Sequence, residues 1–232
     1  MNFKNLPDGK STENQDIIVS INDITSENYL YLLAGVHGDE PEGIYVLSKV
    51  VEWLKGFDDK SSPLSKIPII VIPTLNIDGY RNSTRTNSNG VDLNRNLPST
   101  KWTSIARESK YNPGSAPLSE VENIFMVDLF KKYKPGFIIS FHSWKPMINY
   151  NGDCKDEAEL MSKYNNYVIC DDIENHPTPG SLGEYAPEKY SSPVITFEFP
   201  VLNEKNSLES IWLENEKALK ALLTSEQMAN RF

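Results

Sequence analysis

Short apolar runs alternate along this chain with segments whose apolar residues recur at helical spacing. Strands are predicted at residues 29–36, 67–72, 137–141, 168–170 and 193–199, where the runs are short and bounded by turn residues. Helices are predicted at residues 42–55, 119–132 and 207–223. This alternation is typical of an α/β fold with a mixed, mostly parallel sheet and helices on both faces. Nothing in the pattern requires a second domain, so residues 1–232 are expected to form a single one.

A long polar stretch interrupts this alternation at residues 76–102, which are rich in Asn, Ser, Thr and Arg. Loops of this length are uncommon in compact domains and usually carry function. At the start of the helix predicted for 119–132, Ser119 and Glu122 have the spacing of a capping box, in which each side chain satisfies a backbone N–H of the first turn. We therefore expect an irregular functional loop, followed by a capped helix.

Two of the three histidines follow predicted strands. His37 comes after the first strand and forms an H-x-x-E pair with Glu40, and His142 comes after the strand at 137–141. Carboxyl ends of parallel strands meet at one edge of a sheet, so these side chains are expected to converge. Zinc accepts imidazole nitrogens and carboxylate oxygens, and catalytic sites commonly use three such ligands. The pattern predicts a metal site, although a polar turn and a hydrogen-bonded core histidine would give the same isolated signals.

A carboxylate lies in the otherwise apolar strand predicted at 193–199. Strand alternation places Glu198 on the same face as Val194 and Thr196, opposite three apolar side chains. In a dry cleft this carboxylate would gain basicity and could accept a proton from water. On a solvated sheet face it would be an ordinary surface residue.

Arginines are dense in the polar stretch, where Arg81, Arg85 and Arg95 have few other charges around them. A guanidinium fork matches a carboxylate bidentately, so arginines beside a metal cleft would bind a substrate carboxylate. Asp92 could accept a hydrogen bond from a metal-bound histidine and orient its ring. Solvated surface arginines remain the alternative.

Composition narrows the range of partners and compartments. The chain has 232 residues, 39% of them hydrophobic, and a net charge of -9, which disfavours nucleic acid as a partner. It begins without a secretory signal and contains no apolar run long enough to cross a membrane. The two cysteines, Cys154 and Cys170, form no motif and are expected to be free thiols in a reducing compartment. These observations predict a cytoplasmic protein.

Four motifs occur in order between residues 30 and 200: GVHGDEPEG, NIDGYRNSTRTNSNGVDLNRNLP, SFHSW and ITFEF. In this combination the chain resembles the zinc metallocarboxypeptidases, and among them the bacterial murein peptide amidase branch. The resemblance implies a three-layer α/β sandwich around a mixed sheet of about eight strands. It implies one zinc ion per chain, held by His37, Glu40 and His142.

The resemblance also implies roles for the remaining polar residues. Glu198 matches the family's catalytic glutamate, and Arg85 matches the arginine that steadies the polarised carbonyl. Asn94 and Arg95 match the pair that clamps a terminal carboxylate of the substrate, and Asp92 matches the partner of the first histidine.

One family feature has no counterpart in the sequence, namely the tyrosine on a mobile loop that covers the substrate. Alignment of the segment PGSLGEY puts Asn175 or His176 near that position. His176 and Ser181 are therefore candidates for substrate contact. A loop histidine in a proline-rich turn is the alternative for His176.

These features together predict zinc-dependent hydrolysis of an amide bond beside a free carboxylate, in a small peptide substrate. The resemblance implies that the favoured bond joins γ-D-glutamate to meso-diaminopimelate in murein peptides. A carboxypeptidase and an N-acyl amino acid deacylase of the desuccinylase or aspartoacylase type would use the same site. A zinc-containing peptide-binding module without turnover is the alternative from another class, but such a module would usually lack the general base or a ligand. The exact peptide and the oligomeric state are left open by the sequence.

Overall fold

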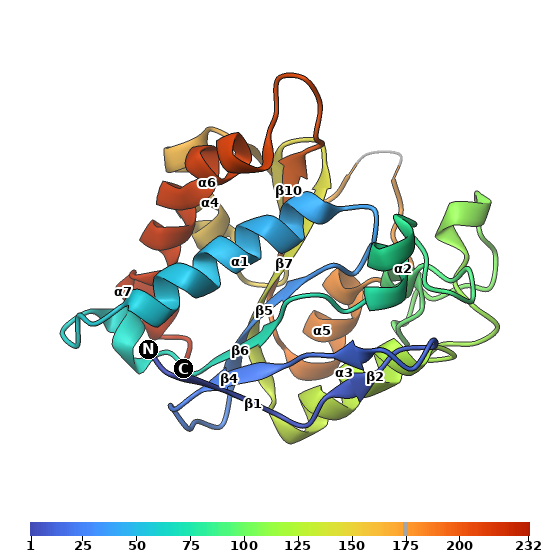
Figure 1. The fold of residues 1–232 in the computed structure, drawn as a ribbon, viewed down its shortest axis with the longest axis horizontal. Coiled ribbons are helices and arrows are strands. Elements are labelled where there is room, and N and C mark those ends of the chain that lie inside the picture. Colours follow the sequence, from blue (N-terminus) through green and yellow to red (C-terminus); the bar gives the residue numbers. More distant parts are fainter. Residues whose placement is uncertain (174–175) are drawn as a thin grey trace.

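The computed structural model describes residues 1–173 and 176–232, and these are built around an eight-stranded sheet (Figure 1). The strand order is β1-β4-β6-β5-β7-β10-β8-β9. The strands are β1 (Phe3–Asn5), β4 (Ser20–Asn22), β5 (Tyr29–Ala34), β6 (Ile69–Ile72), β7 (Pro135–Trp144), β8 (Met147–Asn151), β9 (Val168–Cys170) and β10 (Val194–Pro200). Strands β6, β5, β7 and β10 run parallel to one another, as do β8 and β9, whereas the pairs β1–β4, β4–β6 and β8–β10 are antiparallel. Strands β2 (Gly9–Lys10) and β3 (Asp16–Ile17) form a separate hairpin.

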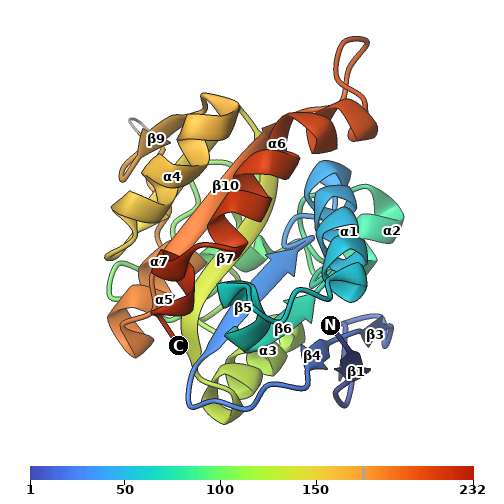
Figure 2. The same ribbon diagram turned by 90° about the vertical axis from the view of Figure 1, so that its left-hand side faces the viewer.

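Helices cover both faces of the sheet, which makes the fold a three-layer α/β sandwich (Figure 2). The helices are α1 (Pro41–Gly56), α2 (Ile77–Asn82), α3 (Val121–Lys132), α4 (Lys155–Asn165), α5 (Leu182–Tyr190), α6 (Leu208–Leu223) and α7 (Glu226–Ala229), with 3-10 turns η1 (Pro63–Lys66), η2 (Leu93–Arg95) and η3 (Ser109–Tyr111). Helices α1, α4, α6 and α7 pack on one face. Helices α3 and α5 pack on the other.

Strand alternation explains why two separate cores form. In β7, Phe137, Ile139 and Phe141 enter the core under α1, α4 and α6, while Ile138 enters the core under α3 and α5. Successive side chains of a strand point to opposite faces, so a central strand covered on both sides must be apolar almost throughout. The same rule leaves Ser140 and His142 on the face of Ile138, toward the end of the strand.

The predicted fold class is confirmed, and the predicted central strands and long helices are present within a few residues. The strand predicted at 67–72 begins at Ile69, and β7 continues through His142 to Trp144. Short elements were missed: β1 and β4 at one edge, β8, and helices α4 and α5. The stretch 76–102 was predicted to be entirely irregular, but it contains α2 and the turn η2. Among the described residues, none of the helices has both the length and the apolar character needed to cross a bilayer.

The capping box predicted for α3 is wrong. Glu120 is the N-cap residue, and no side chain caps the helix. The Ser119 hydroxyl instead donates to Glu120 Oε1 (2.7 Å). The buried Glu122 carboxylate accepts from the backbone N–H of Thr12 (2.9 Å) and from Asn87 Nδ2 (3.1 Å). Tertiary hydrogen bonds have thus replaced the local ones that the spacing suggested.

These hydrogen bonds belong to a polar network that orders the loop between α2 and α3. Asn96 is fully buried at its centre. Its Nδ2 atom lies within hydrogen-bond distance of Pro113 O (2.8 Å), Ala116 O (3.0 Å) and Ser119 Oγ (2.9 Å). Its Oδ1 accepts from the Glu120 backbone N–H (3.3 Å) and from Asn123 Nδ2 (3.3 Å). A single buried amide therefore joins residues 92–96 to residues 113–123.

We expect Asn96→Ala to destabilise the protein by about 2–4 kcal/mol, because it leaves several buried polar groups without partners. Urea unfolding followed by circular dichroism would measure the change. Asn82→Ala, at an exposed asparagine, is the control and should shift the free energy of unfolding by less than about 0.5 kcal/mol. Equal effects of the two substitutions would contradict the role given to the network.

Candidate metal-centred active site

The candidate site lies across the carboxyl ends of the neighbouring parallel strands β5, β7 and β10. In the β7–β10 register, His142 is paired with Glu198, so both side chains lie on the same face of the sheet. His37 and Glu40 lie in the turn that joins β5 to α1. Gly35 starts this turn at φ 61°, a backbone conformation that a residue with a side chain rarely adopts. The turn thereby directs His37 toward the end of β7.

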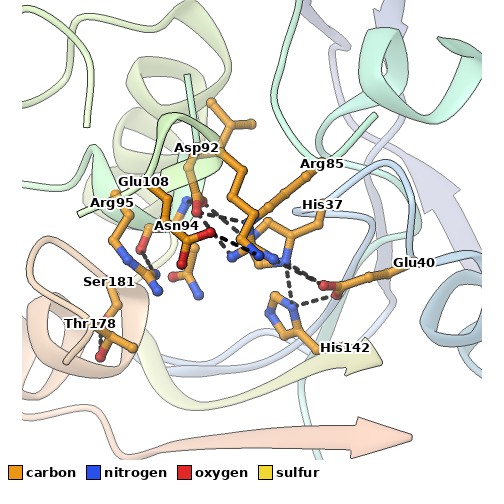
Figure 3. A network of polar contacts seen from close by, with 12 residues as sticks. His37, Glu40, Arg85, Asp92, Asn94, Arg95, Glu108, His142, Thr178 and Ser181 are labelled. Carbon is orange, nitrogen blue, oxygen red and sulfur yellow. Dashed lines mark hydrogen bonds and ion pairs between the residues drawn. The ribbon is translucent and has the colours of Figure 1, made fainter. Parts of the chain in front are cut away.

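His37, Glu40 and His142 are buried and converge on one point (Figure 3). His37 Nδ1 lies 2.7 Å from Glu40 Oε1, and His142 Nδ1 lies 2.9 Å from Glu40 Oε2. The two Nδ1 atoms are 3.2 Å apart. Two imidazole nitrogens and a carboxylate that face one another make a donor set suited to zinc, and these residues could hold a metal ion.

The outer nitrogens of both rings are held by further side chains. His37 Nε2 lies 3.1 Å from Asp92 Oδ1, and His142 Nε2 lies 2.9 Å from Ser140 Oγ. Asp92 is fully buried and also accepts from Arg85 Nε (3.0 Å). These contacts fix the ring orientations and leave both Nδ1 atoms directed at Glu40.

The charges around the triad favour ionised Glu40 and Asp92. Burial alone would raise the pKa of each carboxyl, but the positive charges nearby outweigh it and lower both pKa values. For Glu40 the opposing charges are those of His37 and His142, and for Asp92 they are those of His37 and Arg85. Burial and Arg85 lower the pKa of His37, yet the carboxylates of Glu40 and Asp92 raise it overall to about 8.

The pKa of Glu198 is shifted in the opposite direction, upward. Its Oε2 atom is buried and has no hydrogen-bond partner among the described residues. Burial, followed by the negative charge of Glu40, raises the pKa of Glu198 to about 8. A carboxylate held in this way is a strong base for its type, and its unpaired oxygen is available to a substrate or a water molecule.

The loop after α2 supplies the remaining polar groups. Arg85 forms an ion pair with Asp92 and reaches Glu40 Oε1 at 3.4 Å. Asn94 follows Asp92, and its Oδ1 accepts from the Leu182 backbone N–H at the start of α5 (2.9 Å). The Arg95 side chain is folded back onto the carbonyl of Asn94 (2.6 Å). All three side chains line one cleft together with His37, Glu40 and Glu198.

His176 and Ser181 also line this cleft. His176 Nδ1 lies 2.7 Å from an Arg107 nitrogen, and its ring packs edge-on against Trp144. Ser181 is the N-cap of α5, and its side chain accepts from the Glu184 backbone N–H, so its visible role is structural. Asn175, the other candidate for the missing lid position, lies outside the described residues.

The cleft has a volume of about 300 Å³ and includes residues that the sequence did not single out. The ring of Tyr111 lies close to Arg85 and Arg95, whose guanidinium carbons are 5.1 and 5.3 Å from its centroid. Asn149 and Asn151 come from β8, and Thr196 comes from β10. The alternation noted for Glu198 could have indicated Thr196, but Tyr111 and the β8 residues lie in segments without a distinctive pattern.

Comparison with known proteins agrees with this geometry. The profile of the family described as zinc carboxypeptidase matches residues 6–197. The chain belongs to the zinc carboxypeptidase family. The match contains His37, Glu40 and His142 together with the loop arginines, and it ends one residue before Glu198. As a member of this zinc-dependent family, the protein is a hydrolase that acts on peptide bonds.

Within the zinc carboxypeptidase family, the chain is similar to murein peptide amidase A of Vibrio campbellii, with 30% identity over 87% of this chain and 81% of the relative. It is 27% identical to murein peptide amidase A of Escherichia coli K12, over 77% of this chain and 74% of the relative. The fold resembles murein-tripeptide amidase of Escherichia coli O157 (TM-score 0.74, 24% identity, 97% and 93% coverage). It also resembles carboxypeptidase A of Helicoverpa armigera (TM-score 0.78, 16% identity, 97% and 69% coverage).

The raised pKa of Glu198 predicts a measurable stability effect in the metal-free protein. Between pH 4.5, the ordinary value, and about 8, the folded protein holds a proton on Glu198 that the unfolded chain has released. The contribution of this residue to stability therefore falls as pH rises through that window. We expect Glu198→Gln to stabilise the chelator-treated protein by roughly 1–3 kcal/mol at pH 8 and to have little effect near pH 4.5.

Thermal unfolding of both proteins across this pH range would test the prediction. Glu204→Gln, which changes an exposed loop glutamate, is the matched control and should leave the pH profile unchanged. A stabilisation by Glu198→Gln that does not vary with pH would show that the carboxyl is ionised throughout.

Proposed function

We propose that this protein is a murein peptide amidase that hydrolyses the bond between γ-D-glutamate and meso-diaminopimelate, using one zinc ion held by His37, Glu40 and His142. The observation that carries the proposal is the convergence of these three side chains next to Glu198, whose Oε2 is unpaired among the described residues and which lines one cleft with His37 and Glu40. The names of the relatives from Vibrio campbellii and Escherichia coli support the choice of substrate.

The donor set fits zinc, since two neutral imidazoles and one carboxylate leave room for a further ligand. When bound, zinc acidifies a water molecule and polarises a carbonyl group. Asp92 Oδ1 lies 3.1 Å from Nε2 of His37, and Ser140 Oγ lies 2.9 Å from Nε2 of His142. These contacts keep the Nδ1 atoms of both rings directed at Glu40. The lowered pKa of Glu40 keeps its carboxylate ionised, which is the state in which it would bind a metal ion.

Glu198 is the proposed general base. Its unpaired Oε2 faces no competing donor in the described part of the chain, so it can accept the proton of the attacking water. The oxygen of that water adds to the scissile carbonyl carbon. Glu198 then returns the proton to the leaving nitrogen, the carbon–nitrogen bond breaks, and the products are a carboxylate and an amine.

Arg85 is proposed to stabilise the developing oxyanion. Its guanidinium is oriented by Asp92 and reaches toward Glu40, which places its charge beside the triad. Removal of one such donor typically lowers the rate by a factor of ~10²–10³. Asn94 and Arg95 are proposed to hold the carboxylate next to the scissile bond, and Tyr111 supports the Arg95 guanidinium from one side. His176 and Ser181, which line the same cleft, are proposed to contact the substrate.

Incubation with L-Ala-γ-D-Glu-meso-diaminopimelate tests the central proposal. We expect the zinc-loaded protein to release free diaminopimelate, detected by mass spectrometry, and a chelator to abolish release. Glu198→Gln should lower kcat by a factor of ~10²–10⁴ while zinc content stays the same. No release from protein that contains zinc would overturn the murein assignment, and C-terminal peptides and N-acyl amino acids would then be the substrates to examine.

Substitution of the two arginines gives a second test, because the roles proposed for Arg85 and Arg95 affect kcat and KM differently. We expect Arg85→Ala to lower kcat by a factor of ~10²–10³, because the lost interaction forms in the transition state. Arg95→Ala should raise KM more than it lowers kcat, because the lost interaction holds the substrate carboxylate in both states. Arg81→Ala, at an exposed position on α2, is the matched control. Identical profiles for Arg85→Ala and Arg95→Ala would contradict the division of roles.

A further inference from the structure

Glu42 is a buried carboxylate that the proposed reaction does not use. It lies in the first turn of α1, two residues after Glu40, and is 3% exposed. No lysine, arginine or histidine of the described residues lies within ion-pair distance of its carboxylate. Removal of a carboxylate from water is costly unless hydrogen bonds or opposite charges replace the lost hydration. The positive end of the α1 dipole offsets part of this cost, and hydrogen bonds must offset the rest.

Two short hydrogen bonds hold the Glu42 carboxylate. Its Oε2 accepts from the Ser143 hydroxyl (2.6 Å), and its Oε1 accepts from the Leu202 backbone N–H (2.6 Å). Hydrogen bonds to a carboxylate are shorter and stronger than those between neutral groups. One side chain therefore joins the start of α1 to the end of β7 and to the loop between β10 and α6.

The bond to Ser143 lies between the two segments that carry the triad. Ser143 directly follows His142, and its backbone N–H donates to Glu40 Oε2 (3.2 Å). The first turn of α1 also packs closely on β7, since a Cβ atom on Gly43 would come within 2.6 Å of the Phe141 carbonyl oxygen. These two segments are thus attached to each other by several contacts, of which the bond to the Ser143 hydroxyl is one.

The bond to Leu202 lies where the sheet no longer holds the chain. Glu198 is the last residue of β10 that is paired with both neighbouring strands, β7 and β8. Pairing with β7 alone continues as far as Pro200, which has no N–H to donate. The bond from the Leu202 N–H to Glu42 attaches the chain two residues further on. It therefore limits how far the end of β10, with Glu198, can move away from α1.

We propose that Glu42 is a positioning residue, which holds the end of β10 against the segments that carry the triad and so sets the distance between the metal centre and Glu198. This inference rests on the proposed function, in which Glu198 is the general base. Glu42 is not among the residues that line the cleft, so it acts through the backbone of its partners. A displacement of a reacting group by about 1 Å can lower a rate by about 10²-fold.

Glu42→Met fills a similar volume but accepts neither hydrogen bond. We expect it to lower kcat for L-Ala-γ-D-Glu-meso-diaminopimelate by about 10- to 100-fold and to change KM by less than about threefold, with unchanged zinc content. Glu42→Gln should keep kcat within about threefold of the wild type. Its amide oxygen can accept from the Leu202 N–H, and its NH2 group can donate to the Ser143 hydroxyl. Glu52→Ala, at an exposed glutamate of the same helix, is the matched control and should change neither parameter.

Amide hydrogen exchange, followed by NMR on the zinc-loaded protein, tests the attachment without any substrate. We expect the Leu202 amide to exchange slowly in the wild type and in Glu42→Gln, and roughly 10-fold or more faster in Glu42→Met. Ser143→Ala leaves the Leu202 bond in place and should not alter this exchange. Leu202→Pro removes the donor instead of the acceptor and should lower kcat as Glu42→Met does. It replaces Glu42→Met in the kinetic test if that variant does not fold.

Wild-type kcat in Glu42→Met, or equal exchange of the Leu202 amide in both proteins, would overturn the positioning role and leave the amidase assignment standing. A loss of kcat in Glu42→Gln as large as in Glu42→Met would also overturn it, because the charge of Glu42 rather than its hydrogen bonds would then be responsible. If the wild type does not cleave the tripeptide, the proposed function fails. Exchange at Leu202 then decides about the attachment by itself, since faster exchange in Glu42→Met supports it and unchanged exchange overturns it.

Discussion

The parallel pairing of β7 with β10 is the constraint on which the site depends. It sets His142 beside Glu198 at strand ends about 5 Å apart, on the same face of the sheet. Strand β5 pairs with the other side of β7 and delivers His37 and Glu40 to the same edge. A shift of one residue between β7 and β10 would turn one of these side chains into the opposite core. The apolar side chains that alternate with them oppose such a shift, so core packing and site geometry are fixed by the same register.

The three carboxylates of the site are chemically similar but differ in pKa, because their surroundings differ. Asp92 lies between His37 and Arg85, and Glu40 lies between two imidazoles, so both are stabilised as anions. Glu198 is less buried as a residue, but its Oε2 is buried without a hydrogen-bond partner among the described residues, and burial followed by the charge of Glu40 raises its pKa. Ligands need low proton affinity, and a base needs high proton affinity. The site supplies both because Glu40 and Asp92 have basic partners at hydrogen-bond distance, whereas Glu198 Oε2 has none among the described residues.

The sequence was sufficient for the central strands, because their continuous apolar runs arise directly from burial on both faces. It was also sufficient to bring His37, Glu40 and His142 to one place, since strand ends determine where such residues meet. It could not predict β8 or α5, whose short segments have mixed polarity. It could not predict the order of the loop after α2 either, because contacts such as Asn96 to Asn123 join residues distant in the chain. The capping box failed for the same reason: Ser119 and Glu122 found tertiary partners.

The residues that could be predicted from the sequence and those that could not lie in different parts of the structure. The groups proposed for chemistry lie at the ends of central strands and in the loop bound to them, where the sheet fixes their positions. Other polar groups of the cleft, Asn149 and Asn151, lie on β8, outside the central parallel strands. Substitution at Asn149 or Asn151 changes the hydrogen-bonding character of the pocket without altering the β7–β10 register. A fold arranged in this way can keep one hydrolytic centre while its selectivity changes, which is consistent with the similar folds of amidases and carboxypeptidases at low sequence identity.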